Sequence, residues 1–181
     1  MNYNPNIHHR KSIRLKEYDY SKEGLYFITI CCDARKHLFG VIANGKMILN
    51  DAGIIANQCW LDIPNHFPNA ILHEHIIMPN HIHGIIELKS PHVGVENIQP
   101  LRTHHEFQKI IPRSIGSIVR GYKIGVTKWF RNNRAENIPP LRVWQRNYYE
   151  HIIRNEKSYQ IISNYIVNNP KNWTDDKFNK E

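Results

Sequence analysis

Apolar and polar positions in the first third of the chain predict a strand, a hairpin and a helix. Residues 25–31 combine aromatic and β-branched side chains, which is typical of a buried strand. Asn44-Gly45 joins two short apolar stretches and predicts a tight hairpin turn, because this pair adopts positive φ angles easily. Apolar residues at helical spacing then predict a helix that Asp51 caps and that ends before Pro64.

The remaining two thirds of the chain predict two more strands, a long helix, a further strand and a last helix. Pro112 opens the long helix, whose apolar residues recur at helical spacing. The last helix stops before Pro170, because the residue that precedes a proline disfavours the helical conformation. Residues 90–99 hold few core residues and predict a loop. The predicted strands cover 71–78, 81–88 and 143–153, and the predicted helices cover 113–132 and 156–168.

This order of elements predicts an α+β fold, namely a ferredoxin-like split βαβ sandwich with an antiparallel sheet and an added C-terminal helix. Helices on one face of such a sheet would leave its other face or its rim free for a ligand. The expected organisation is a basic N-terminal arm over 1–20, one folded domain over 21–173 and a polar tail over 174–181.

Positive charge is concentrated in two segments of the chain. The 181 residues carry 24 Lys and Arg against 16 Asp and Glu, a net charge of +8. Residues 101–134 hold eight basic side chains and the single acid Glu106, and a second basic stretch covers 10–16. This distribution favours a polyanionic partner.

Three sequence features bear on where the protein works: apolar runs, the N-terminus and the cysteines. No apolar run approaches the roughly 20 residues that a membrane span needs. The N-terminus lacks the apolar stretch of a secretory signal peptide. The three cysteines, Cys31, Cys32 and Cys59, form no CxxC pair and no even framework, so a reducing cytoplasm is the simplest setting.

Two His-x-His pairs are candidate metal ligands. His81 and His83 lie on a predicted strand, where alternation places both imidazoles on one face, about 6 to 7 Å apart along the strand. Two rings at that spacing can converge on one ion. His73 and His75 form a second such pair on the neighbouring strand, and partly exposed strand histidines are the simpler interpretation of either. Spacing alone does not choose between the pairs.

A tyrosine and an amide share one face of the last predicted helix. Tyr165 and Asn169 are four residues apart, so both side chains could approach one point on the sheet. The competing interpretation is an ordinary core stripe of Ile161, Ile162, Tyr165 and Ile166, with Asn169 capping the helix before Pro170.

Six sequence blocks resemble, in the same order, the IS200-like single-tyrosine transposases of the HUH class, and among them the REP-associated branch. Together they span roughly residues 25–173, and their combination is far more specific than one His-x-His pair. The blocks are YFITIC at 26–31, RKHLFG at 35–40, MPNHIHG at 78–84, SIGSIVRGYK at 114–123, VWQRNYYEHIIRN at 143–155 and YIVNNP at 165–170.

The resemblance implies a catalytic domain over 21–173 with a metal site and one nucleophilic tyrosine. Transferred position by position, it implies that His81 and His83 bind the metal, that Asn169 completes its shell and that Tyr165 is the nucleophile. It also implies Mg²⁺ or Mn²⁺ as the ion, although two imidazoles suit Mn²⁺ or later transition metals better than Mg²⁺.

The implied activity is cleavage and joining of single-stranded DNA through a 5′-phosphotyrosine at hairpin-flanked sites, without ATP. The alternatives are a non-catalytic nucleic-acid-binding module derived from a transposase and a metal-dependent hydrolase that uses water. The sequence does not decide between a monomer and a homodimer, nor does it reveal the DNA target. Phosphate contacts are expected from one basic helix, whose other interpretation is a solvated face. Its candidate residues are Arg113, Arg120, Lys123, Lys128, Arg131 and Arg134.

Overall fold

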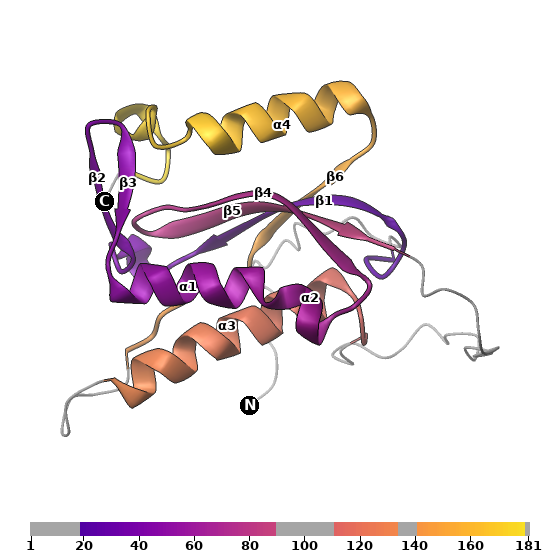
Figure 1. The fold of residues 1–181 in the computed structure, drawn as a ribbon, viewed down its shortest axis with the longest axis horizontal. Coiled ribbons are helices and arrows are strands. Elements are labelled where there is room, and N and C mark those ends of the chain that lie inside the picture. Colours follow the sequence, from indigo (N-terminus) through magenta and orange to yellow (C-terminus); the bar gives the residue numbers. More distant parts are fainter. Residues whose placement is uncertain (1–18, 90–110, 134–140, 180–181) are drawn as a thin grey trace, which may run out of the picture.

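The computed structural model describes residues 19–89, 111–133 and 141–179, and it confirms the predicted α+β fold (Figure 1). The N-terminal arm before Asp19, the predicted loop over 90–99 and the candidate Arg134 lie outside the described residues. The strands are β1 Gly24–Cys31, β2 Gly40–Ala43, β3 Lys46–Leu49, β4 Ala70–Ile77, β5 His81–Leu88 and β6 Tyr149–Ile153. The helices are α1 Asp51–Leu61, α2 Ile63–His66, α3 Ile115–Asn132 and α4 Glu156–Asn168, with short 3₁₀ turns at Asp33–Arg35 and Trp173–Asp175.

Four strands form an antiparallel sheet in the order β4-β5-β1-β6, and β2 pairs with β3 in a separate hairpin. The central strand β1 pairs with β5 on one side and with β6 on the other. β1 and β4 therefore have β5 between them, as the predicted split βαβ arrangement requires.

Helices cover both faces of this sheet. α1 and α3 lie against one face and α4 lies across the other (Figure 1). The expectation of a free second face is therefore wrong for the part of the sheet beneath α4. The core between the sheet and the α1/α3 layer is made of buried apolar side chains. They include Tyr26, Ile28 and Ile30 of β1, Ile82 and Ile86 of β5, Trp60 of α1, and Ile118, Tyr122 and Val126 of α3.

A glycine in β5 lets α1 pack closely on the sheet. Gly84 faces the indole of Trp60, and a Cβ at position 84 would lie only 2.2 Å from a ring carbon. No real side chain fits there without displacing Trp60. Gly84, which follows His83, therefore makes room for Trp60 in the core on the side of the sheet opposite to α4.

Three predicted boundaries differ from the structure. The cap of α1 is Asn50 and not Asp51, because the Asn50 side chain accepts from the backbone N–H of Gly53 at 2.9 Å. α3 begins at Ile115, where Ser114 caps it. The last strand begins only at Tyr149. Trp144 forms an isolated antiparallel bridge with Cys32, through backbone hydrogen bonds of 2.9 and 3.0 Å, and this bridge does not continue into β6.

None of the helices in the described residues is both long enough and apolar enough to cross a membrane.

Candidate functional site

His81 and His83 lie together on the face of β5 that α4 covers. Their ring centroids are 4.4 Å apart, and both side chains are buried. Ile82 between them points to the opposite face and joins the α1/α3 core. The alternation of side chains along a strand therefore produces the paired imidazoles that the sequence pattern predicts.

The other His-x-His pair does not converge. β4 has a register shift between Leu72 and His75, and the two histidines face different layers. His73 contacts Tyr159 of α4, whereas His75 hydrogen-bonds to Asn57 and stacks on an indole in the α1 layer. A β-bulge breaks the two-residue alternation that the prediction assumed.

Asn80 fixes the tautomer of His81, that is, which ring nitrogen carries the proton. The Asn80 amide nitrogen donates to the backbone carbonyls of Phe178 at 2.8 Å and Arg35 at 3.1 Å, which defines the orientation of the amide. Its oxygen can then only accept, so the contact of 2.9 Å with Nδ1 of His81 places the proton on Nδ1. Nε2 of His81 carries a lone pair, is buried and has no hydrogen-bond partner within the described residues.

His83 has two hydrogen-bonding neighbours. Thr29 lies opposite His83 in the β1–β5 pairing, and its hydroxyl is 2.8 Å from Nδ1. The Tyr165 hydroxyl is 3.2 Å from Nε2. In the tautomer that carries its proton on Nδ1, His83 donates to the Thr29 hydroxyl and Nε2 accepts from the phenol. One lone pair cannot serve both a phenol proton and an ion, so ligation of an ion by Nε2 would release the phenol.

A carboxylate that sequence reasoning missed completes the cluster. Asp176 lies beyond the last helix, in the segment expected to be a polar tail, and is buried. Its ligand atoms and those of His81 and His83 all lie within 4.8 Å of one another. The Asn169 amide donates to one oxygen of Asp176 at 2.9 Å, and the backbone N–H of Phe178 donates to the other at 2.7 Å. No residue spacing signals this contact, because a 3₁₀ turn brings the chain back to the sheet.

Tyr165 lies in the last turn of α4, and Asn169 is the C-cap residue that follows it, as the competing interpretation expected. The Asn155 side chain caps the N-terminus of this helix. Ile162 and Ile166 of the expected core stripe pack in the core, whereas Tyr165 is 39% exposed and Ile161 is 60% exposed. The Tyr165 ring instead lies against His83, with centroids 5.1 Å apart. Asn169 is buried, and its amide oxygen has no hydrogen-bond partner within the described part of the chain.

The electrostatics of the site keep the phenol protonated when no ion is present. Burial is the main cause that raises the pKa of Tyr165 to about 12, and the charge of Asp176 adds to it. The nearby Asn169 side chain acts in the opposite direction. A cation beside the phenol would reverse this balance, because it favours the phenolate.

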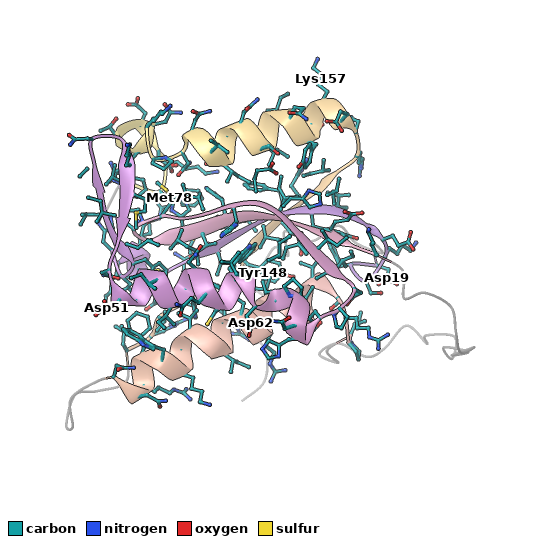
Figure 2. All side chains as sticks on the ribbon, in the orientation of Figure 1. Asp19, Asp51, Asp62, Met78, Tyr148 and Lys157 are labelled. Carbon is teal, nitrogen blue, oxygen red and sulfur yellow. The ribbon has the colours of Figure 1, made fainter. Side chains whose placement is uncertain are left out.

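Aromatic side chains from the segment after α4 cover the histidines. The Phe178 ring lies 4.5 Å from the His81 ring, and Trp173 lies 6.0 Å from it. Met78, labelled in Figure 2, packs with these two side chains between the sheet and this segment. These contacts shield the two imidazoles from solvent.

The donor set fits a divalent metal ion. Nε2 of His81 and the amide oxygen of Asn169 are buried acceptors that no donor among the described residues contacts, an unfavourable arrangement for polar atoms in a protein interior. Two imidazoles and one carboxylate are common ligands of transition ions. The cluster of His81, His83 and Asp176 could therefore bind a metal.

Acid is expected to destabilise the metal-free protein through the buried histidines His81 and His83. Burial lowers the pKa of His81 to about 4, although Asp176 opposes the shift, and burial together with His81 lowers the pKa of His83 well below its usual value. A histidine of the unfolded chain titrates near pH 6.5. As the pH falls from about 6.5 towards 4, the unfolded chain takes up protons that the folded chain does not, so the free energy of unfolding decreases.

Thermal unfolding in the presence of a chelator checks this expectation. The melting temperature should fall across that window, and His83→Asn should make the fall shallower. His151→Asn, a change at an exposed histidine of β6, serves as the control. An equally steep fall in wild type and His83→Asn would contradict it.

The basic candidates on α3, namely Arg120, Lys123, Lys128 and Arg131, lie on the side of the sheet opposite to Tyr165, since α3 and α4 cover different faces (Figure 1). Lys123 is partly buried, and its ammonium donates to the backbone carbonyls of Gln145 at 2.8 Å and Asn147 at 2.9 Å. Contact with a phosphate would compete with these bonds. The exposed candidates at the start of α3 and along it are Arg113, Arg120, Lys128 and Arg131.

Comparison with known proteins gives one strong and one distant relation. No protein-family model matches the chain. A protein of Haemophilus influenzae that is described as uncharacterized is 53% identical over 176 residues, covering 97% of this chain and 96% of that protein. A candidate REP-associated tyrosine transposase of the same species is 25% identical over 173 residues, covering 90% of this chain and 84% of that protein.

A solved structure shows a similar fold. The structure of a REP-associated tyrosine transposase bound to a REP hairpin matches 88% of this chain and 74% of its own chain, with a TM-score of 0.55 and 21% identity. The chain therefore belongs to the same family as the uncharacterized H. influenzae protein, and it is distantly related to the REP-associated tyrosine transposases, one of which shares its fold.

Proposed function

We propose that this protein is a metal-dependent endonuclease and strand transferase for single-stranded DNA. In this proposal Tyr165 attacks a phosphodiester and forms a 5′-phosphotyrosine, and the upstream strand leaves with a free 3′-OH. The observation that carries the proposal is the position of the Tyr165 hydroxyl, 3.2 Å from Nε2 of His83, within the cluster that also contains His81 and Asp176.

The chain's own residues supply most of what the reaction needs. Tyr165 is exposed enough to meet a DNA strand, yet its hydroxyl is oriented by His83. Asn80 and Thr29 each contact Nδ1 of one imidazole, which leaves the two Nε2 atoms as the nitrogens that can bind an ion. Because the phosphotyrosine is itself a phosphodiester, a later 3′-OH can reverse the attack on another strand, and neither ATP nor water is consumed.

His81, His83 and Asp176 would hold the ion, with Asn169 contributing its amide oxygen. When bound, a divalent ion would withdraw charge from a non-bridging phosphate oxygen and stabilise the developing phenolate. The carboxylate and the amide add oxygen donors to the two nitrogens, and such a mixed set suits Mn²⁺ better than Mg²⁺.

We propose single-stranded DNA with a hairpin as the partner. Support comes from the solved REP-associated tyrosine transposase, which is bound to a REP hairpin and shares the fold. The exposed basic residues of α3 would contact phosphates, which predicts affinity that falls steeply with salt. Because α3 and Tyr165 lie on opposite sides of the sheet, a strand that meets both must pass around an edge of the sheet.

A labelled DNA pool tests the proposal. Strands with a hairpin, randomised flanks and a label at the 3′ end are incubated with protein and Mn²⁺, then separated under denaturing conditions. We expect a 3′-labelled protein–DNA adduct, whereas a 5′ label should appear only in a free fragment that ends in a 3′-OH. Absence of any Mn²⁺-dependent adduct across the pool would contradict the proposal.

Asp176→Asn is expected to weaken Mn²⁺ binding by roughly 10-fold, because it removes a negative oxygen donor but keeps the size of the side chain. Electron paramagnetic resonance of free Mn²⁺ measures the affinity. Asp175→Asn, one residue earlier and exposed, is the matched control. Equal affinities in the two variants would exclude Asp176 from the metal shell.

One observation favours a second candidate function. Two histidines and a carboxylate also form the metal sites of hydrolases that activate water, and Asp176 provides that carboxylate. In such an enzyme both DNA fragments would be released free. Cleavage without a protein–DNA adduct would therefore support a hydrolase, and an adduct would exclude it.

A further inference from the structure

A second polar cluster joins α4 to the edge strand β4. One carboxylate oxygen of Glu74 accepts two hydrogen bonds, from the Tyr159 hydroxyl at 2.9 Å and from the Ser163 hydroxyl at 3.1 Å. Lys157, near the start of α4, points away from the sheet in Figure 2, whereas Tyr159 and Ser163 face it. We call Glu74, Tyr159 and Ser163 the α4 clamp.

The bulge in β4 creates this clamp. Glu74 contacts α4, and so does its neighbour His73, although adjacent residues of a regular strand point to opposite faces. The register shift between Leu72 and His75 allows both to face the helix. Bulges commonly re-aim side chains in this way beside functional sites.

Contacts of His73 connect the α4 clamp to Glu87 of β5. The single hydroxyl proton of Tyr159 goes to Glu74, since a carboxylate can only accept. The Tyr159 oxygen lies 3.1 Å from Nδ1 of His73, and Nε2 of His73 lies 3.1 Å from Glu87. A neutral imidazole carries one N–H and donates to only one of these two partners. Partial burial acts against ionisation of Glu74, but hydrogen bonds from its own backbone, Tyr159 and Ser163 hold the pKa of its carboxyl below the usual value.

We propose that Glu74 is a positioning residue that sets the rotation and height of α4 and thereby places the Tyr165 hydroxyl. The inference rests on the proposed function of Tyr165 as the nucleophile. Tyr159 and Ser163 are four residues apart, about one helical turn, so one oxygen can meet both hydroxyls at a single helix orientation. Ser163 lies only two residues before Tyr165 in α4. Because the helix is rigid over this distance, the helix orientation that the Ser163 hydrogen bond fixes also determines where the Tyr165 side chain starts.

The apolar contacts of α4 do not fix its orientation so sharply. Ile162 and Ile166 pack against isoleucines of the sheet, and such contacts tolerate small rotations. A rotation of roughly 20° moves a group at the helix surface, about 5 to 6 Å from the axis, by about 2 Å. Misplacement of a reacting atom by 1 Å can cost about 100-fold in rate. Loss of the clamp is therefore expected to slow attack by Tyr165 without removing any reacting group.

The test compares the double variant Tyr159→Phe/Ser163→Ala with Tyr149→Phe/Ser158→Ala. Both remove one phenolic and one aliphatic hydroxyl, but only the first pair belongs to the clamp. We expect single-turnover adduct formation at saturating DNA to be about 10- to 100-fold slower in the clamp variant. DNA affinity and Mn²⁺ affinity should match those of the control. A rate equal to the control, or a loss explained by weaker DNA binding, would overturn the proposal.

Two further measurements separate positioning from folding and from the proposed function itself. Glu74→Gln keeps an acceptor oxygen for both hydroxyls and should retain a rate near wild type, whereas Glu74→Leu should show the full loss. In protein with ¹³C-labelled tyrosine rings, the Tyr165 signal, assigned with Tyr165→Phe, should shift in the clamp variant but not in the control. An unchanged Tyr165 signal in the clamp variant would overturn the positioning role of Glu74. Absence of adduct in every variant, wild type included, would instead contradict the proposed function, and the Tyr165 signal would still test the positioning role.

Discussion

Tyr165→Phe is expected to abolish the covalent protein–DNA adduct and to leave binding of hairpin DNA unchanged. Phenylalanine has no oxygen with which to form a phosphodiester, and loss of a nucleophile costs on the order of 1,000-fold or more in rate. The ring contacts with Phe27 and His83 should persist, because they involve the ring and not its hydroxyl. Adduct yield is measured on denaturing gels, and DNA affinity is measured by fluorescence anisotropy.

Tyr149→Phe is the matched control for this change. Tyr149 is an exposed tyrosine of β6, and it lies in a block that resembles the transposases but not at the nucleophile position. The control should form adduct at the wild-type rate. Normal adduct formation by Tyr165→Phe would show that another residue is the nucleophile.

His81→Ala is expected to lower Mn²⁺ affinity by at least about 100-fold and to eliminate cleavage. The change removes the buried nitrogen that has no hydrogen-bond partner within the described residues, and this atom is the one best prepared to bind an ion. The size of the effect follows from the loss of a direct ligand, since even residues that only orient ligands contribute about 10- to 100-fold in metal affinity. Calorimetric titration with Mn²⁺ measures it.

His73→Ala distinguishes the two His-x-His pairs. His73 belongs to the polar cluster around Tyr159 and does not share a face with His75. This variant should bind Mn²⁺ with wild-type affinity. If it lost metal binding while His81→Ala kept it, the assignment of the metal centre would be wrong. Circular dichroism of each variant checks that the sheet is intact.

The fold could be predicted where local patterns decide it. The Asn44-Gly45 turn and the strands at β1, β4 and β5 follow from residue types over a few positions. The last strand could not be delimited this way. Of its first six predicted residues, Val143 and Gln145 make backbone hydrogen bonds beside an isolated bridge to Cys32. Lys123 of α3 adds contacts, because its ammonium donates to two backbone carbonyls and its own carbonyl accepts from the Trp144 indole. Such contacts depend on the packed molecule and leave no periodic signal.

The site could be predicted only in part, for a similar reason. His81, His83, Tyr165 and Asn169 lie in blocks whose spacing and resemblance single them out, and the structure brings them together. Their chemical roles stay predictions. Asp176 has no comparable signal, because a turn that the sequence pattern does not indicate carries it back to the histidines. The failure of His73 and His75 to converge depends on a bulge, which residue types alone do not reveal.

The most direct measurement is identification of the residue that becomes joined to DNA. After reaction with hairpin DNA and Mn²⁺, the adduct is digested with nuclease and protease and sequenced by tandem mass spectrometry. The proposal predicts a nucleotide joined through its 5′-phosphate to the phenolic oxygen of Tyr165, in a peptide from α4. A nucleotide on another side chain, or DNA cut with no modified peptide, would contradict it.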